Sequence, residues 1–183
     1  ALAGDRAAFS TLAERYRQRL VRFCAFLVGD PDEAESLAQE ALAVAFVQLA
    51  SFDESRDYYF WLRGIGLNYC RNYIRKRARH AKPVEPERLA PAADPTGRKQ
   101  GVLSGILREE QSERLWLALG QLPEAYREAV VLHYLEGLDY AAISEITGDS
   151  PGALRVRTLR ARSILRNNLG SVVDTWMRTV TDD

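Results

Sequence analysis

Five arginines in the C-terminal third of the chain form a cluster that could bind a polyanion. No acidic residue interrupts the cluster, although the whole chain balances 25 basic against 25 acidic residues. A guanidinium group stays charged at physiological pH and donates several hydrogen bonds, so the cluster suits phosphate groups. Its members are Arg155, Arg157, Arg160, Arg162 and Arg166.

The residues around this cluster predict a helix-turn-helix. A short helical segment begins at Asp139 and ends at Gly148, and Ser150 followed by Pro151 has the form of an N-cap with proline in the first helical turn. A basic helix after such a turn is typical of a helix that enters the major groove of DNA. A basic helix that only faces water is the alternative. The inward face of this helix is expected to hold Leu154, Ala161 and Leu165.

The N-terminal half carries two opposed runs of charge. Residues 30–40 contain five acidic residues and no basic one, whereas residues 63–82 contain basic residues and no acidic one. The net charge of zero hides this separation. Opposite charges within one small domain suit a protein that holds a basic protein surface and DNA at the same time.

The elements that position these charges are predicted to be helices throughout. Apolar residues recur at helical spacing, and no segment alternates in the manner of a strand. In the N-terminal half we expect a helix that ends near Gly29, a second from about Pro31 to Ala50, and a third that begins near Tyr58.

The chain is predicted to be all-α, with two helical domains joined by a flexible linker. Four of the seven prolines lie in residues 80–105, which show little periodicity and form the predicted linker. The predicted domains are residues 1–79 and 106–170, and residues 171–183 form a C-terminal extension.

The C-terminal domain resembles region 4 of sigma-70 family transcription factors. Residues 122–123 read Leu-Pro, residues 126–128 Tyr-Arg-Glu, residues 134–138 Tyr-Leu-Glu-Gly-Leu and residues 160–162 Arg-Ala-Arg. The resemblance implies that this domain binds the minus-35 promoter element. The residues that would contact DNA there are Ser150, Pro151, Gly152, Arg155, Arg157, Arg160 and Arg162.

The N-terminal domain resembles region 2 of the same family, in the group-4 or extracytoplasmic-function (ECF) form that carries only regions 2 and 4. The acidic run stands where the family binds the beta-prime clamp of core RNA polymerase, and region 4 would meet the beta flap. The residues implied in clamp binding are Asp32, Glu33, Glu35, Gln39 and Glu40.

The third helix stands where the family reads and melts the minus-10 element. Bases that leave the stack are captured by aromatic faces and a cationic track, and the loop over residues 51–57 would take a flipped base. We interpret Trp61 and Tyr73 as core residues, because aromatic side chains at helical spacing are usually packed. The residues expected to contact minus-10 DNA are Asn68, Arg71, Asn72, Arg75, Lys76, Arg77 and Arg79.

Several positions depart from the family pattern, and Ser36 is the most informative of them. Ser36 stands where a second acid usually follows Glu35, so a phosphoserine would restore the missing negative charge. Some branches of the family that lack this acid are controlled by Ser/Thr kinases, so the resemblance implies a Ser/Thr kinase among the candidate partners. A serine that is tolerated within an acidic helix is the alternative. The other departures are Leu67, Asn72 and the pair Thr158-Leu159.

The resemblance implies a bacterial transcription initiation factor that directs core RNA polymerase to promoters with minus-35 and minus-10 elements. Region 2 would melt the promoter, and an anti-sigma factor clasped between the domains would be a further partner. The alternative from another class is a stand-alone helix-turn-helix regulator that binds duplex DNA as a dimer.

An enzyme is not expected. The chain has two histidines, and we find no glycine-rich phosphate loop, nucleophile elbow or metal-spaced cluster, so neither a cofactor nor a metal is predicted. Cys24 and Cys70 lie within helical patterns and predict buried thiols in a reduced, cytoplasmic protein. No apolar run approaches the length of a membrane span, so insertion into a membrane is not expected.

Overall fold

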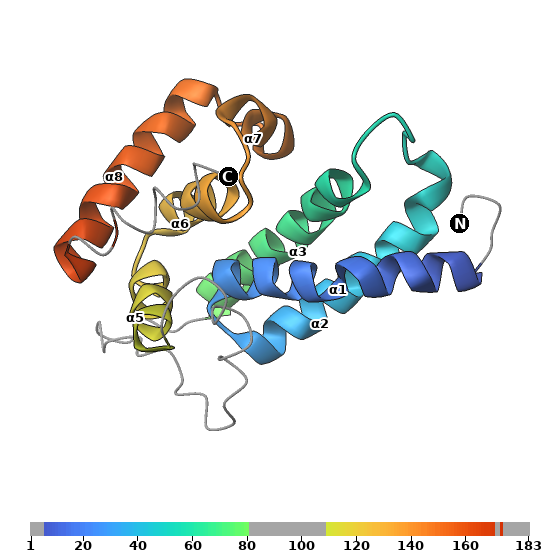
Figure 1. Cartoon of the computed structure of the whole chain (residues 1–183), viewed down its shortest axis with the longest axis horizontal. Coiled ribbons are helices and arrows are strands. Elements are labelled where there is room, and N and C mark those ends of the chain that lie inside the picture. The colour runs from blue at the N-terminus through green and yellow to red at the C-terminus, as the bar shows by residue number, and fades with distance from the viewer. Residues whose placement is uncertain (1–5, 81–108, 171–172, 174–183) are drawn as a thin grey trace. The chain divides into compact units, whose positions relative to one another are not determined.

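The computed structural model describes residues 6–80, 109–170 and 173, and every regular element among them is helical (Figure 1). The chain divides into two compact units, Ala1–Glu87 and Arg88–Asp183. The all-α prediction is confirmed. Residues 81–105 of the predicted linker, and the extension over residues 171–183 apart from Val173, lie outside the described residues.

The N-terminal unit is a bundle of three α-helices. They are α1 (Arg6–Val28), α2 (Pro31–Gln48) and α3 (Tyr58–His80), and a 3₁₀ turn, η1 (Leu49–Ser51), follows α2. Each of the three α-helices contacts the other two. The bundle therefore has one shared core, and the outer face of each helix is left for contacts with other molecules.

Backbone geometry explains the sharp corner between α1 and α2. Gly29 has a positive φ of 73°, which glycine adopts without steric cost, and its N–H bonds to the Ala25 carbonyl at 2.9 Å. The Asp30 carboxylate accepts from the backbone N–H groups of Asp32 and Glu33 at 3.1 and 3.2 Å, and Pro31 follows in the first turn. The predicted ends of these two helices at Gly29 and Pro31 are confirmed.

The second helix ends slightly earlier than predicted. The α-helical bonds stop at Gln48, and the next three residues tighten into the 3₁₀ turn. The Ser51 hydroxyl donates to the Gln48 carbonyl at 2.7 Å. This side-chain bond satisfies a carbonyl that the end of a helix would otherwise leave without a partner.

One part of the shared core lies between α1 and α3, where the two helices approach closely. Leu20 and Leu62 are fully buried, and a Cβ atom on Gly66 would lie only 2.9 Å from Cδ1 of Leu20. Gly66 therefore lets α3 approach α1. Cys24 and Cys70 are free thiols with no solvent exposure, as the sequence predicted.

The C-terminal unit is built around its last long helix, α8 (Pro151–Leu169). Its other helices are α5 (Glu109–Gly120), α6 (Glu124–Val130), η2 (Val131–Leu135) and α7 (Tyr140–Thr147). The helices α5, α6 and α7 all pack against α8. Residues from all of them are buried, so the orientation of α8 depends on the whole unit.

A π-helical turn and a histidine set the path of the chain from α6 into α7. The Glu136 N–H bonds to the carbonyl of Val131, five residues earlier, at 3.0 Å. His133 lies 2.8 Å through Nδ1 from the Leu138 carbonyl oxygen. A carbonyl only accepts, so Nδ1 carries the proton and donates. The His133 ring also stacks on Tyr140, at a centroid distance of 4.5 Å, which gives this histidine a structural role.

Among the described residues, no helix is long and apolar enough to cross a membrane. Within the same ranges, no three His, Cys, Asp or Glu side chains are grouped in a way that could hold a metal ion.

Replacement of Leu62 by alanine tests the shared core of α1, α2 and α3. We expect Leu62→Ala to lower the free energy of unfolding of the N-terminal unit by about 2–5 kcal/mol, because it leaves a cavity at a fully buried site. Hydrogen-exchange mass spectrometry should show faster amide exchange in α1 to α3, with peptides from α5 to α8 unchanged. Val47→Ala is the control, because Val47 is 79% exposed. Equal protection in both variants would contradict this account of the core.

Candidate nucleic-acid interface

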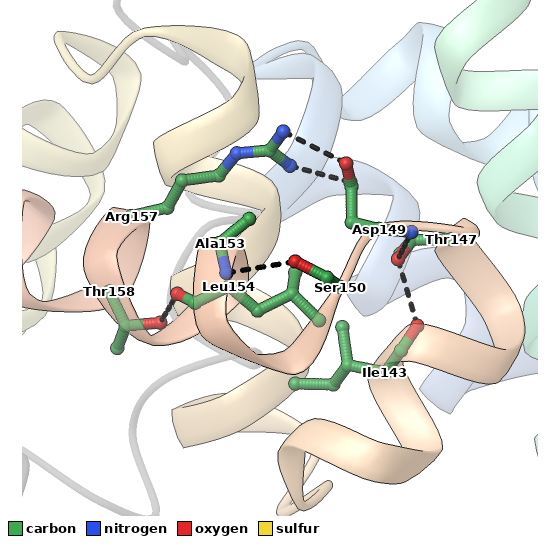
Figure 2. A network of polar contacts seen from close by, with 8 residues as sticks. All are labelled: Ile143, Thr147, Asp149, Ser150, Ala153, Leu154, Arg157 and Thr158. Atoms are coloured by element: carbon green, nitrogen blue, oxygen red, sulfur yellow. Dashed lines mark hydrogen bonds and ion pairs between the residues drawn. The ribbon is translucent and has the colours of Figure 1, made fainter.

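The turn between α7 and α8 is held by hydrogen bonds from several consecutive residues (Figure 2). Gly148 ends α7 with a φ of 77°, and its N–H bonds to the Ser144 carbonyl at 2.9 Å. The Thr147 hydroxyl donates to the Ile143 carbonyl at 2.9 Å and accepts from the Asp149 N–H at 3.2 Å. The turn is therefore fixed by its own backbone and side chains, and the predicted break at Gly148 is confirmed.

The start of α8 also agrees with the sequence. Ser150 is the N-cap, its hydroxyl accepts from the Ala153 N–H at 3.2 Å, and Pro151 opens the helix (Figure 2). A cap of this kind sets where the helix begins and which way its first side chains point. Helix α7 begins in the same manner, because the Asp139 carboxylate accepts from the Ala142 N–H at 2.7 Å.

The inner face of α8 is buried, which determines the face that remains outside. Leu154, Ala161 and Leu165 are buried as predicted, and Thr158 joins them with 1% exposure. The Thr158 hydroxyl donates to the Leu154 carbonyl at 2.8 Å, so burial leaves no unsatisfied donor (Figure 2). An α-helix turns about 100° per residue, so the opposite side of α8 points away from the core.

Arg157 has an acidic partner, although no acidic residue lies between the arginines of its helix. Its guanidinium group donates two hydrogen bonds to the Asp149 carboxylate, at 2.5 and 2.9 Å (Figure 2). Both side chains are about one quarter exposed. This bidentate pair ties α8 to the turn before it, so Arg157 has a structural contact as well as a place near the proposed DNA face.

Arg155 and Arg160 are exposed, and each is positioned by a tyrosine from another helix. The Arg155 guanidinium lies over the Tyr140 ring, 5.5 Å from its centroid. Nη1 of Arg160 donates to the Tyr126 hydroxyl at 3.3 Å, and this bond raises the pKa of Arg160 above its usual value. Both guanidinium groups therefore have a preferred direction before any ligand binds.

The end of α3 gathers most of the residues predicted for minus-10 DNA on one exposed face. Nη2 of Arg75 donates to Oδ1 of Asn72 at 3.1 Å, and Nε of Arg79 donates to the Arg75 carbonyl at 3.4 Å. Helical geometry places Asn68 and Lys76 beside them. The exposed face comprises Asn68, Asn72, Arg75, Lys76 and Arg79, and half-buried Arg71 borders it.

Arg77 lies on the other side of α3. It makes a hydrogen bond with the Tyr73 hydroxyl. Burial and the charges of Glu33 and Asp30 raise the pKa of Tyr73, and Arg77 opposes this shift. Arg77 therefore points toward the start of α2, so the structure separates it from the other predicted minus-10 residues.

An aromatic cluster lies at the start of α3 beside the loop over residues 51–57. The Phe52 ring centroid is 5.0 Å from that of Trp61 and 5.6 Å from that of Tyr58. Burial and the neighbouring Tyr16 raise the pKa of Tyr58 to about 12. Trp61 packs in this cluster but stays half-buried, and Tyr73 is also half-buried, so both lie at the edge of the core.

The acidic residues of α2 share an exposed face with Ser36. Asp32, Gln39 and Glu40 are exposed on it, and Glu33 and Glu35 are half-buried at its sides. Glu35 forms an ion pair with Arg17 of α1 at 2.5 Å. The apolar residues Phe46 and Val47 continue this face toward the end of α2, with 37% and 79% exposure. The sequence analysis did not identify these two residues as exposed. Their positions in the helical repeat, which differ from those of the buried residues of α2, were the available signal.

The comparisons with known proteins match both units. The family model for Sigma-70 region 2 matches residues 12–80, and the model for Sigma-70, region 4 matches residues 112–165. The chain is also 33% identical over 175 residues to the ECF RNA polymerase sigma factor SigW of Bacillus subtilis, with 91% of each chain covered. The chain belongs to the sigma-70 family, as an ECF sigma factor. The region 2 match spans the three-helix bundle apart from the first residues of α1, and the region 4 match spans α5 to α8 apart from the start of α5 and the end of α8.

Solved structures of sigma factors share the fold. The sigma factor RpoE of Bartonella quintana, solved in complex with the anti-sigma factor NepR, matches with a TM-score of 0.63 at 23% identity, over 88% of this chain and 96% of that one. CnrH, solved in complex with the cytosolic domain of CnrY, matches with a TM-score of 0.61 at 23% identity, over 95% and 92%. As a sigma factor, this chain directs RNA polymerase in transcription initiation.

The sequence analysis of this sigma factor also did not identify two exposed apolar residues on α8. Val156 and Leu159 are 47% and 59% exposed, whereas the apolar residues predicted for the inner face are buried. Their spacing from Leu154 and Ala161 was a usable signal, because it puts them on the outer side of the helix.

Replacement of Gly152 by alanine should separate stability from DNA binding in this sigma factor. A Cβ atom there meets nothing within 4 Å and Gly152 has no positive φ, so the change should raise the stability of the C-terminal unit by about 0.5–1 kcal/mol. Gly152 lies on the outer side of α8, however, so the added methyl group should weaken binding to minus-35 DNA. Thermal unfolding and a gel-shift titration measure the two effects.

Gly120→Ala is the matched control for this prediction. Its Cβ atom is equally unobstructed, and Gly120 ends α5 in another part of the unit. It should leave DNA affinity unchanged. If Gly152→Ala binds minus-35 DNA as tightly as the parent, the outer side of α8 does not approach DNA at this position.

Proposed function

We propose that the outer side of α8 enters the major groove of the minus-35 element. The observation that carries the proposal is the combination of a locked turn, a buried inner face and arginines held outward by Tyr126 and Tyr140. Phosphate contacts orient a protein on DNA, and arginine is suited to read guanine edges. Arg155 and Arg160 have the geometry for this role, with Arg162 beside them and the N-terminal residues Ser150, Pro151 and Gly152 closest to the groove.

For region 2, we propose that the exposed face at the end of α3 holds the minus-10 strand. Its amides and cations follow one side of the helix, which suits an unpaired strand with a phosphate backbone. Arg71 borders this face and is included in the proposal. Arg77 is assigned to positioning instead, because it bonds to Tyr73 on the other side of the helix.

The acidic face of α2 is proposed to bind the beta-prime clamp, and region 4 the beta flap. The helix dipole also favours the negative charges of Asp32 and Glu33, which lie in the first turn of α2. The protein is proposed to act in the cytoplasm and to catalyse no reaction. Because RpoE and CnrH were solved with NepR and with the cytosolic domain of CnrY, a protein that restrains this factor is also proposed.

In vitro transcription with core RNA polymerase and a promoter library tests this assignment. Initiation should require the protein, and the active promoters should share two motifs. Arg160→Ala should lower minus-35-dependent initiation about tenfold or more, because it removes a charge aimed at the groove. Tyr126→Phe should cause a smaller loss, since the arginine stays but its orienting hydrogen bond is removed.

Arg22→Ala is the charge-matched control, because Arg22 is exposed on α1 and should not affect minus-35 recognition. No binding to core polymerase would reject the assignment of α2. Sequence-specific binding to duplex DNA as a dimer, without core polymerase, would favour a stand-alone regulator.

We also propose that phosphorylation of Ser36 strengthens clamp binding. Ser36 is exposed, and its hydroxyl donates only a long bond of 3.4 Å to the Asp32 carbonyl, so a kinase could reach it. A phosphoryl group would add about two negative charges to the acidic face. The hypothesis requires the basic partner surface to outweigh repulsion from the neighbouring carboxylates.

Ser36→Glu should therefore increase affinity for core polymerase severalfold over the parent, measured by fluorescence anisotropy at two salt concentrations. Ala43→Glu is the matched control, because Ala43 is exposed about two helical turns further along the same face. If Ser36→Glu binds core polymerase no better than the parent, or no better than Ala43→Glu, the serine is only tolerated and the switch is rejected.

A further inference from the structure

The outermost side of α8 is uncharged, although the helix carries five arginines. Val156 lies opposite the buried Leu154 and Thr158, and Leu159 follows it one turn later. Gly152 precedes them and Ser163 follows them on the same side, and both are exposed. We call these four residues the neutral seam of α8.

The seam lies outside the buried core of its own unit. The buried residues of α8 are on the other side, and Val156 and Leu159 keep 47% and 59% of their surface exposed. A single exposed leucine is ordinary on a protein surface. Two branched apolar side chains at consecutive turns of a helix proposed to bind DNA require a better explanation.

Arginines border the seam on both sides. At about 100° per residue, Arg155 and Arg166 lie along one side and Arg160 along the other. Phosphates form the two walls of the major groove and base edges form its floor. A helix with cations at its sides and a neutral centre matches this distribution, so charge complementarity indicates that the floor of the groove covers the seam.

We infer that Val156 and Leu159 contact C5-methyl groups of thymine in the minus-35 element and make this sigma factor selective for thymine there. Among the base edges in the major groove, thymine is the one that carries an apolar methyl group. It belongs to one strand, so an apolar contact distinguishes T·A from A·T as well as from G·C. Gly152 supports the contact, because it has no side chain to keep the backbone away. The inference rests on the proposed docking of α8.

Deoxyuridine tests the inference directly, because it differs from thymidine by this methyl group alone. The probe is a duplex promoter selected by the complete holoenzyme, with each minus-35 thymine replaced in turn by deoxyuridine. We expect a loss of affinity of about fourfold at one or two positions, as for the burial of one methyl group. Substitutions outside both promoter elements should have no effect.

The side chains are tested by combining these probes with variants. Val156→Ala and Leu159→Ala should each weaken binding to the thymine promoter and abolish the sensitivity to uracil at one position. Ser163→Ala, on the same seam, is the matched control and should retain the sensitivity. Because the altered residues are exposed, thermal unfolding should match that of the parent.

A gain of affinity provides the converse test. At a position sensitive to uracil, cytosine should bind worse than 5-methylcytosine, which restores only the methyl group. The parent should show this gain, and the corresponding alanine variant should not.

Three results would overturn the inference. Equal affinity for thymine and uracil at every minus-35 position would exclude methyl contacts, and retained sequence specificity would then leave the proposed docking of α8 intact. Unchanged uracil sensitivity in both alanine variants would assign the contact to other residues. If the two alanine variants keep the promoter affinity of the parent but bind core RNA polymerase more weakly, a protein covers the seam. If Arg160→Ala leaves the minus-35 specificity of the holoenzyme unchanged, the docking of α8 itself is rejected.

Discussion

The buried inner face of α8 is the constraint on which the C-terminal unit depends. Leu154, Thr158, Ala161 and Leu165 commit one side of the helix to packing against α5, α6 and α7. The cap at Ser150 and the pair between Asp149 and Arg157 then fix where the helix begins and how it is rotated. These contacts set the direction of the outward side chains, so the surface that we propose for DNA binding is arranged before DNA is present.

Charge is distributed in the same directional way in the N-terminal unit. The acidic start of α2 and the basic end of α3 belong to one small bundle. They come close at Tyr73, which is hydrogen-bonded to Arg77 and interacts electrostatically with Glu33. Elsewhere the two charges face outward on separate helices. A net charge of zero thus combines with separate acidic and basic faces, which suit partners of opposite charge.

The helical elements and much of the interface were predictable because they depend on local signals. The positive-φ glycines at 29 and 148 and the caps at Asp30 and Ser150 lie next to the helices they bound. The partners of the arginines were less predictable. Asp149 lies outside the helix of Arg157, and Tyr126 is distant in sequence from Arg160, so only the packed unit brings these groups together. The direction of Arg77 likewise depends on how α2 and α3 pack, and the domain boundaries predicted at residues 79 and 106 remain predictions.

The neutral seam also has a consequence for evolution. Gly152, Val156, Leu159 and Ser163 contribute little to the folded core, so these positions tolerate substitution without loss of the domain. Duplicated copies of such a gene could diverge at these few positions while the scaffold stays constant. New sets of target genes would then arise through a handful of surface changes, each without penalty to protein abundance.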